Sequence, residues 1–397
     1  MIFYTSSAPS ERSSNHFAPD HCRPTCAETQ PGNKVMIVVD AHEDIAWNAL
    51  TFGRDYTLSV AETRAREVDM ETPAHNGHTL LGWPEWIRGC VAVVFATLFA
   101  APVRRRYGLW DTQCYTDAEE AHNLYRASLD FYWRLVGEHP DKFCLIRMRA
   151  DLEQVLNGWQ GEEPRETRVG LVILMEGADG VRRPAELPEW YEAGVRILGP
   201  AWTGTRYAGG TGEPGPLSDD GRALLEVMAD LKMILDLSHM TEEGVLEALD
   251  RYQGSVIASH SNPLARLPHS AKPERHLSDH VISQIAERDG VIGIVTFNRF
   301  LKDGWSPSDG RQAVTIDDVI AHIDHICQVV GDAEHVGLGS DFDGGFGVDK
   351  VPLGLDSVAD LRLIGGALSA RGYNSRDVEA ILGGNWLRVL RRALPES

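Results

Sequence analysis

Short apolar runs recur along this chain and alternate with longer segments of helical periodicity. Eight of the runs are rich in Val, Ile and Leu and lack the polar alternation of a half-exposed strand, which is typical of parallel strands buried on both faces. They span residues 35–40, 91–98, 169–175, 195–198, 233–237, 255–259, 291–295 and 335–339. The pattern therefore predicts a parallel sheet of eight strands.

The segments between these runs carry apolar residues three or four positions apart, which predicts amphipathic helices. We expect helices over residues 118–135, 219–231, 241–249, 279–286, 316–330, 358–370 and 375–394. Eight strands that alternate with helices favour a closed (β/α)8 TIM-like barrel over an open sheet. The predicted fold is one α/β barrel domain over residues 35–397, with the C-terminal helices included.

The first 34 residues depart from this pattern. Residues 1–34 are rich in Ser, Pro and Asn and lack the apolar stretch of a secretory signal, so we predict a flexible leader. Cys22 and Cys26 lie in this segment, and we interpret them as an unstructured pair rather than a zinc site, because no further ligands lie nearby.

Charge and hydropathy exclude two classes of partner. The net charge is −20, and an acidic surface of this kind repels nucleic acid and anionic membranes. The longest apolar run, residues 91–103, is about half the length that a membrane-spanning helix needs. We therefore expect a cytoplasmic protein without a nucleic-acid or membrane partner.

Imidazoles and carboxylates follow several of the predicted strands. Barrels of this type carry their chemistry at the C-terminal ends of the strands, where this chain has His42, Asp44, Glu176, His239, His260 and Asp341. Any one histidine in isolation is more often structural than a ligand. Because barrel closure brings the strand ends together, the joint pattern predicts a metal site. His and carboxylate ligands suit Zn²⁺, with Mn²⁺ or Co²⁺ as substitutes.

Six sequence elements also resemble, in order, the signatures of the membrane (renal) dipeptidase family, peptidase M19. They are DAHEDIAWN, ILMEGAD, LDLSHMT, IASHSN, ERHLSDHVI and HVGLGSDFDG, and the resemblance runs from about residue 38 to 394. Each element alone is weakly specific, whereas six in order over one barrel are specific. The resemblance implies a binuclear zinc site at the C-terminal ends of the strands.

The resemblance also implies roles for individual residues. His42 and Asp44 match ligands of the first Zn²⁺, Glu176 matches the carboxylate that bridges both ions, and His239 and His260 match ligands of the second. Asp341 matches the catalytic acid/base, and Arg275 matches the arginine that holds the substrate's C-terminal carboxylate. The implied activity is hydrolysis of dipeptides by a metal-bridging hydroxide, with acceptance of a D-residue at the C-terminal position as a further expectation. A homodimer is compatible with this interpretation.

Two departures from the family pattern lie at the substrate pocket. Trp202 stands where the family often has a histidine, and Asn298 where the family has a tyrosine that contacts substrate. An indole N–H can donate one hydrogen bond but cannot become charged. We therefore expect intact metal chemistry with an altered specificity, in which Trp202 and Asn298 are substrate-contact candidates.

Two other functions stay open. The first is a different amide or lactone hydrolase, or a deaminase; many such relatives carry a metal-bridging lysine, which this chain lacks at a comparable strand end. The second is an inactive metal-binding module that recognises a ligand. Nearby, Asp343 is expected to orient a neighbour through hydrogen bonds, Asp40 and Asp236 to orient a liganding imidazole, and residues 206–216 to form either a lid or a plain connector.

Overall fold

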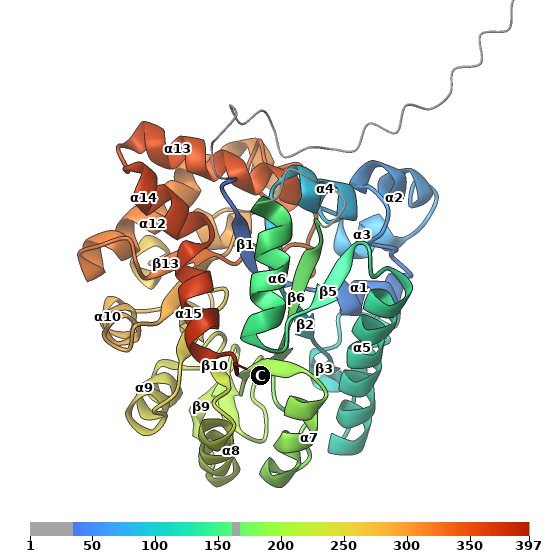
Figure 1. Cartoon of the computed structure of the whole chain (residues 1–397), viewed down its shortest axis with the longest axis vertical. Coiled ribbons are helices and arrows are strands. Elements are labelled where there is room, and N and C mark those ends of the chain that lie inside the picture. The colour runs from blue at the N-terminus through green and yellow to red at the C-terminus, as the bar shows by residue number, and fades with distance from the viewer. Residues whose placement is uncertain (1–34, 161–166, 397) are drawn as a thin grey trace, which may run out of the picture.

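The computed structural model describes residues 35–160 and 167–396 (Figure 1). The leader expected over residues 1–34, with Cys22 and Cys26, lies outside them. Eight parallel strands form the central sheet: β1 (Val38–Glu43), β2 (Val91–Leu98), β6 (Val169–Glu176), β7 (Val195–Gly199), β10 (Ile234–Asp236), β11 (Val256–Ala258), β12 (Val291–Ile294) and β13 (Val336–Leu338). Each strand pairs with the next in this order, and β13 pairs with β1. The predicted (β/α)8 barrel is confirmed, and each predicted run supplies one of its strands.

Within the described residues, five short strands lie outside this barrel. They are β3 (Ala101–Pro102), β4 (Cys114–Tyr115), β5 (Phe143–Leu145), β8 (Ala208–Gly210) and β9 (Glu213–Leu217). β5 pairs with the first residues of β6, and β8 and β9 form an antiparallel hairpin after β7. The sequence pattern missed all five: β3, β8 and β9 contain Pro or Gly, which mark turns rather than strands, and β4 and β5 have only two and three residues.

Helices surround the barrel, as Figure 1 shows. The α-helices are α1 (Ile45–Phe52), α2 (Val60–Arg66), α3 (Thr72–Asn76), α4 (Trp83–Arg88), α5 (Ala118–Glu138), α6 (Arg149–Gln160), α7 (Leu187–Glu192), α8 (Asp219–Asp230), α9 (Glu242–Arg251), α10 (Asp279–Glu287), α11 (Asn298–Leu301), α12 (Ile316–Val330), α13 (Leu363–Arg371), α14 (Ser375–Glu379) and α15 (Asn385–Ala393). Short 3₁₀ turns lie over Val103–Arg105, Pro184–Glu186, Leu264–Arg266, Pro273–Arg275, Pro307–Asp309, Arg311–Ala313, Val348–Lys350 and Val358–Arg362. None of the helices within the described residues is long and apolar enough to cross a membrane.

Local sequence signals set several helix boundaries. The Ser278 hydroxyl accepts a hydrogen bond from Val281 N (3.3 Å) and so caps α10. The Asp318 carboxylate accepts one from Thr315 N (2.8 Å) at the start of α12. α12 covers the predicted range of residues 316–330, and α10 ends one residue beyond its predicted end.

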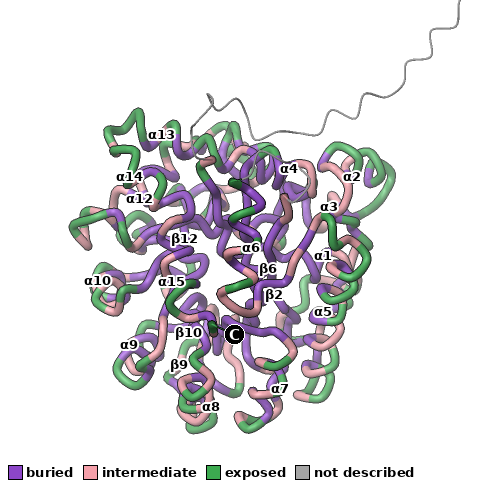
Figure 2. The backbone as a smooth tube through the Cα atoms, in the orientation of Figure 1, coloured by how far each residue is buried: buried purple, intermediate pink, exposed green. Residues whose placement is uncertain are grey.

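The C-terminal helix α15 closes the end of the barrel at which the strands begin. Asn385 donates to Val336 O at the start of β13 (2.8 Å), and the Trp386 indole donates to Leu338 O (3.0 Å). Arg391 pairs with Glu153 of α6 (2.6 Å), so the last helix joins a helix from the middle of the chain. Figure 2 shows the strands as the buried centre of the molecule and the outer helix faces as exposed. Because α15 covers the end at which the strands begin, we expect the functional side chains at the opposite end, where the strands finish.

Candidate metal centre

The six polar residues predicted at the strand ends gather at the open end of the barrel. His42 lies in β1 and Glu176 ends β6, while His239, His260 and Asp341 follow β10, β11 and β13. All six side chains, including that of Asp44 at the start of α1, are buried or nearly so. The structure therefore brings together residues that are up to about 300 positions apart in the sequence.

Three imidazoles converge on the carboxylate of Glu176. The Nε2 atoms of His239, His260 and His42 lie 3.0, 3.3 and 3.6 Å from Glu176 oxygens. The Nε2 atoms of His239 and His260 lie 3.0 Å from each other. Both oxygens of Glu176 are thus engaged, His42 on one and the other two histidines on the second, which is the arrangement expected of a carboxylate that bridges two ions.

A second group of ligand atoms adjoins the first. Ligand atoms of His42, Asp44 and Asp341 all lie within 4.8 Å of one another, as do those of His42, Glu176 and His260. His42 Nε2 lies 3.9 Å from Asp341 Oδ1. The Thr97 hydroxyl donates a hydrogen bond to Asp44 Oδ1 (2.5 Å). This hydrogen bond does not involve the other carboxylate oxygen, Oδ2, of Asp44. His42 and Glu176 are therefore near both potential ligand groups.

Unpaired atoms and crowded charge indicate that this site fits metal ions. Both ring nitrogens of His42 are buried without a hydrogen-bond partner among the described residues, and an unpaired buried polar atom is costly. Burial opposes a charge on His42, but Glu176, Asp44 and Asp341 outweigh it and raise the pKa of the imidazole to about 10. Burial raises the pKa of Asp44 to about 6 and that of Asp341 well above its usual value. The three carboxylates of Asp44, Glu176 and Asp341 thus favour the binding of cations beside them. The histidine nitrogens and carboxylate oxygens are donors that suit zinc, manganese or cobalt.

The backbone adopts strained conformations at two of these residues. His239 and Asp341 have φ values of 67° and 60°, in the left-handed region that residues other than glycine seldom adopt. Such strain costs about 1–3 kcal/mol per residue and concentrates at functional sites. Both residues therefore hold their side chains toward the site at the expense of local stability.

Neighbouring hydroxyls fix the two histidines that follow β10 and β11. Ser259 Oγ lies 2.5 Å from Asp236 Oδ2 and 2.8 Å from Nδ1 of His260, so Asp236 orients His260 through Ser259, as expected of an orienting carboxylate. Thr211 Oγ1 lies 2.9 Å from Nδ1 of His239. In both histidines the hydroxyl contacts Nδ1, and Nε2 faces Glu176.

Asp40 and Asp343 make no hydrogen bond to an imidazole of a described residue; their carboxylates accept hydrogen bonds from neighbouring backbone segments. Asp40 accepts hydrogen bonds from the backbone and hydroxyl of Ser340 (2.7 and 2.5 Å), so the expectation that it orients an imidazole is wrong. The Asp343 carboxylate is fully buried and accepts from Thr79 (2.6 Å) and Leu80 N (2.9 Å), and it pairs with Arg54 (3.1 Å). Asp343 thereby anchors the loop that presents Asp341, in agreement with its predicted orienting role.

Arg275 and Trp202 line the cavity over the site, and Asn298 does not. Arg275 is 4% exposed and donates to His260 O (2.8 Å) and Ser261 Oγ (3.2 Å). Trp202 packs edge-on against Phe99, with ring centroids 4.9 Å apart. Asn298 is fully buried outside the cavity wall, so its position does not support the expected substrate contact. Its chain neighbours Phe297 and Arg299 line the cavity in its place.

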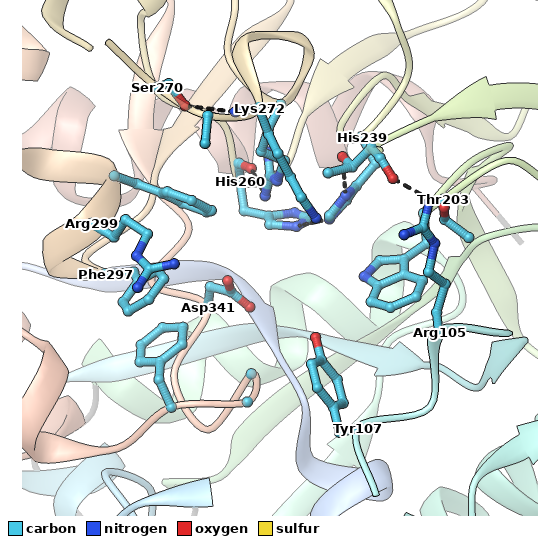
Figure 3. A pocket seen from close by; sticks show the side chains of 18 of the residues that line it. Arg105, Tyr107, Thr203, His239, His260, Ser270, Lys272, Phe297, Arg299 and Asp341 are labelled. Carbon is cyan, nitrogen blue, oxygen red and sulfur yellow. Dashed lines mark hydrogen bonds between the residues drawn. The ribbon is translucent and has the colours of Figure 1, made fainter. Parts of the chain in front are cut away.

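The cavity above the site has a volume of about 830 Å³ and a rim that the sequence pattern missed (Figure 3). Arg105, Tyr107, Lys272 and Arg299 extend into it from loops and short helical turns, and aromatic rings form much of its wall. No periodicity marks loop residues, so a run such as RRRY at positions 104–107 carried no positional signal by itself.

Residues 206–216 are more than a plain connector. They form most of the hairpin β8–β9, which is attached at two points to other loops. Glu213 pairs with Arg104 (2.9 Å) and Arg105 (3.0 Å), and Gly212 N donates to Glu274 (2.8 Å). The hairpin, through Thr211, therefore contributes to the cavity wall.

Comparisons with known proteins agree with this geometry. A family model described as "Membrane dipeptidase (Peptidase family M19)" matches residues 28–395. An uncharacterized protein of Klebsiella pneumoniae from the pqqA 5′ region is 34% identical over 282 residues, covering 66% of this chain and 96% of that protein. Dipeptidase tcpJ of Claviceps purpurea is 35% identical over 175 residues, covering 44% of this chain and 38% of that protein.

Solved structures give the same answer for the fold. The crystal structure of dipeptidase AC, a metallopeptidase of family M19, matches with a TM-score of 0.72 at 25% identity, covering 91% of this chain and 99% of that one. A metallopeptidase from Rhodobacter sphaeroides, liganded with a phosphinate mimic of the dipeptide L-Ala-D-Ala, matches with a TM-score of 0.72 at 24% identity, covering 91% of this chain and 100% of that one. The family match over nearly the whole chain, together with the barrel fold, shows that this protein is an enzyme of the membrane dipeptidase family, peptidase family M19.

Proposed function

We propose that this enzyme hydrolyses dipeptides with two zinc ions at the strand ends. The observation that supports this most strongly is the convergence of three imidazoles on both oxygens of Glu176, next to an Asp44–Asp341 pair. His42 and Asp44 would hold one ion, His239 and His260 the other, and Glu176 both. Bound zinc supplies Lewis acidity, which polarises a carbonyl and lowers the pKa of water to about 7.

Asp341 is placed to move a proton in this reaction. Its carboxylate lies in the ligand group and lines the cavity, and burial together with the charges of Asp44 and Glu176 raises its pKa, which favours the uptake of a proton. We assign it as the acid/base that takes a proton from the attacking water and delivers it to the leaving amine.

Arg275 supplies the contact that limits the substrate to short peptides. Its guanidinium is buried at the cavity wall, next to the ligand histidine His260, and its planar fork suits a carboxylate. A free C-terminal carboxylate held there places the preceding peptide bond over the metal ligands. The Rhodobacter structure contains a mimic of a dipeptide with a C-terminal D-residue, and we extend acceptance of such residues to this enzyme.

Asp341→Asn tests the proposal. We expect the zinc-loaded protein to contain about two ions per chain and to cleave dipeptides, and the variant to retain both ions while its kcat falls by at least about 100-fold. Metal analysis and a dipeptide panel with both stereoisomers at the C-terminal position measure this. The matched control is Asp317→Asn, an exposed carboxylate on α12.

Three results would contradict the assignment. Full activity in metal-free protein would exclude the metal chemistry, and turnover of lactones or cyclic amides without any dipeptide would favour the other hydrolase class. Metal binding without turnover of any of these compounds would favour the ligand-recognition module. The cytoplasmic location and the homodimer stay predictions.

A further inference from the structure

The cavity rim has a charge opposite to that of the whole molecule. The chain carries a net charge of −20, yet the wall above the metal ligands includes Arg104, Arg105, Arg106, Lys272, Arg275 and Arg299. Apart from the proposed ligand carboxylates Asp44, Glu176 and Asp341, Asp303 is the one acidic residue among the described residues that lines it, and it pairs with His269 (2.6 Å). The open part of the cavity therefore presents positive charge.

Two of these cations have no partner within the part of the chain that the structure describes. Lys272 Nζ and the Arg299 guanidinium make no ion pair or hydrogen bond with a described residue, whereas Arg104 and Arg105 share the carboxylate of Glu213. Figure 3 shows Lys272 reaching toward His239 and His260, and Arg299 entering the cavity on the side of Phe297. Both side chains are thus available to an anion inside the cavity.

Both unpaired cations are close to Arg275 in the fold. Arg275 N donates to Lys272 O (3.1 Å) within one 3₁₀ turn, and the Arg275 guanidinium lies 5.3 Å from the ring centroid of Phe300, the residue after Arg299. A C-terminal residue held by Arg275 would therefore lie beside the two segments that carry Lys272 and Arg299.

We propose that the enzyme selects dipeptides whose C-terminal residue is acidic, and that Lys272 and Arg299 bind the side-chain carboxylate. This inference rests on the proposed dipeptidase function and names its substrate class. Aromatic walls at Phe297, Phe300 and Trp305 reduce the screening of charge inside the cavity, so that a carboxylate there interacts more strongly with the two cations than it would in water.

Acid and amide pairs of the same shape test the selection. We expect kcat/KM of the zinc-loaded enzyme to be at least about tenfold higher for Ala-Asp than for Ala-Asn, and likewise for Ala-Glu over Ala-Gln, in the better-accepted stereoisomer. The difference should decrease with added salt, because screening weakens the attraction. In Lys272→Gln and Arg299→Gln the preference should fall by about tenfold through KM, while turnover of Ala-Asn is retained.

The matched control removes a positive charge outside the cavity. Arg266 is exposed in the same loop as Lys272 and does not line the cavity. Arg266→Gln should therefore leave the acid preference unchanged. All three sites are exposed, so the variants should fold, and a thermal melt of each verifies this.

Calorimetric binding separates this inference from the dipeptidase function. Binding of Ala-Asp and Ala-Asn is measured on zinc-loaded Asp341→Asn protein, in which the peptide is expected to stay intact. Tighter binding of Ala-Asp that is lost in the Lys272 and Arg299 variants supports the inference even if no dipeptide is turned over, in which case the proposed function alone fails. Equal binding of the two peptides, a preference that survives both substitutions, or a stronger preference for Asp-Ala over Asn-Ala would each overturn it.

Discussion

At the scale of single residues, two serines on either side of His260 serve different parts of the site. Ser259 Oγ contacts Nδ1 of His260 and the carboxylate of Asp236. Ser261 Oγ accepts from Arg275 at 3.2 Å. Ser259 therefore acts on a proposed metal ligand, and Ser261 acts on the arginine proposed to bind substrate.

Ser259→Ala should weaken zinc binding. Without the hydroxyl, His260 loses the group that links it to Asp236, and loss of such an orienting contact typically lowers metal affinity about 10- to 100-fold. Competition with a chelator of known affinity measures the change. Ser261→Ala is the control, with unchanged zinc affinity and a higher KM; a Ser259→Ala protein that binds both ions as tightly as the parent would remove the orienting role.

The sequence located the metal-ligand candidates because each follows an apolar run in a barrel, where the strand ends are known to meet. It could not locate Lys272 or Arg299, because Lys272 lies in a loop and Arg299 in the four-residue helix α11, and the placement of both depends on tertiary contacts. The position of Asn298 could not be predicted from the sequence for the same reason. Comparison with the family motif predicted that Asn298 contacts the substrate, whereas it is buried in the short helix α11 and its neighbours Phe297 and Arg299 line the cavity.

At the scale of secondary structure, the predicted helix over residues 375–394 is divided into three parts. α14 and α15 are separated by a π-helical turn over Ala380–Gly384. A Cβ atom on Gly383 would lie 2.8 Å from Ile37 O and 3.1 Å from Val39 Cγ2, so the turn passes directly against β1. The apolar periodicity predicted an amphipathic segment, but this close backbone approach is a tertiary feature that periodicity does not contain.

The loop after β13 also requires a glycine, because there is no room for a Cβ atom at position 344. A Cβ atom on Gly344 would lie 2.1 Å from Oδ1 of Asp341, too close for the carboxylate to stay in place. Gly344→Ala should therefore displace Asp341 and lower kcat by about 100-fold, as expected for a misplacement of about 1 Å. Dipeptide kinetics beside a thermal melt measure the effect.

The control for this substitution is Gly366→Ala in α13, where an added Cβ would meet no atom within 4 Å. It should leave kcat unchanged and stabilise the protein slightly, because alanine favours a helix more than glycine does. A Gly344→Ala enzyme with the kcat of the parent would show that the loop can move without disturbing Asp341.

At the scale of the whole molecule, the candidate centre exists only when the barrel is closed. Its six side chains come from β1, the start of α1, and the ends of β6, β10, β11 and β13, so the unfolded chain cannot present them together. The hydrophobic core that closes the barrel places three carboxylates in one buried site, where their mutual repulsion opposes folding. Ions bound there would reverse this effect.

Zinc should accordingly stabilise the folded chain. A ligand that binds only the native state adds about 4 kcal/mol at a thousandfold excess over its dissociation constant, which for a chain of this length corresponds to a rise in Tm of about 5 °C. We expect metal-free protein, prepared with a chelator, to melt lower by about this amount and to recover when zinc is added. His239→Ala should lose most of the zinc-dependent rise, because it removes a ligand from the Glu176 cluster. His280→Ala, which changes an exposed histidine on α10, should keep it. Equal melting temperatures with and without zinc, in protein whose metal content has been measured, would mean that these strand-end side chains do not form the site.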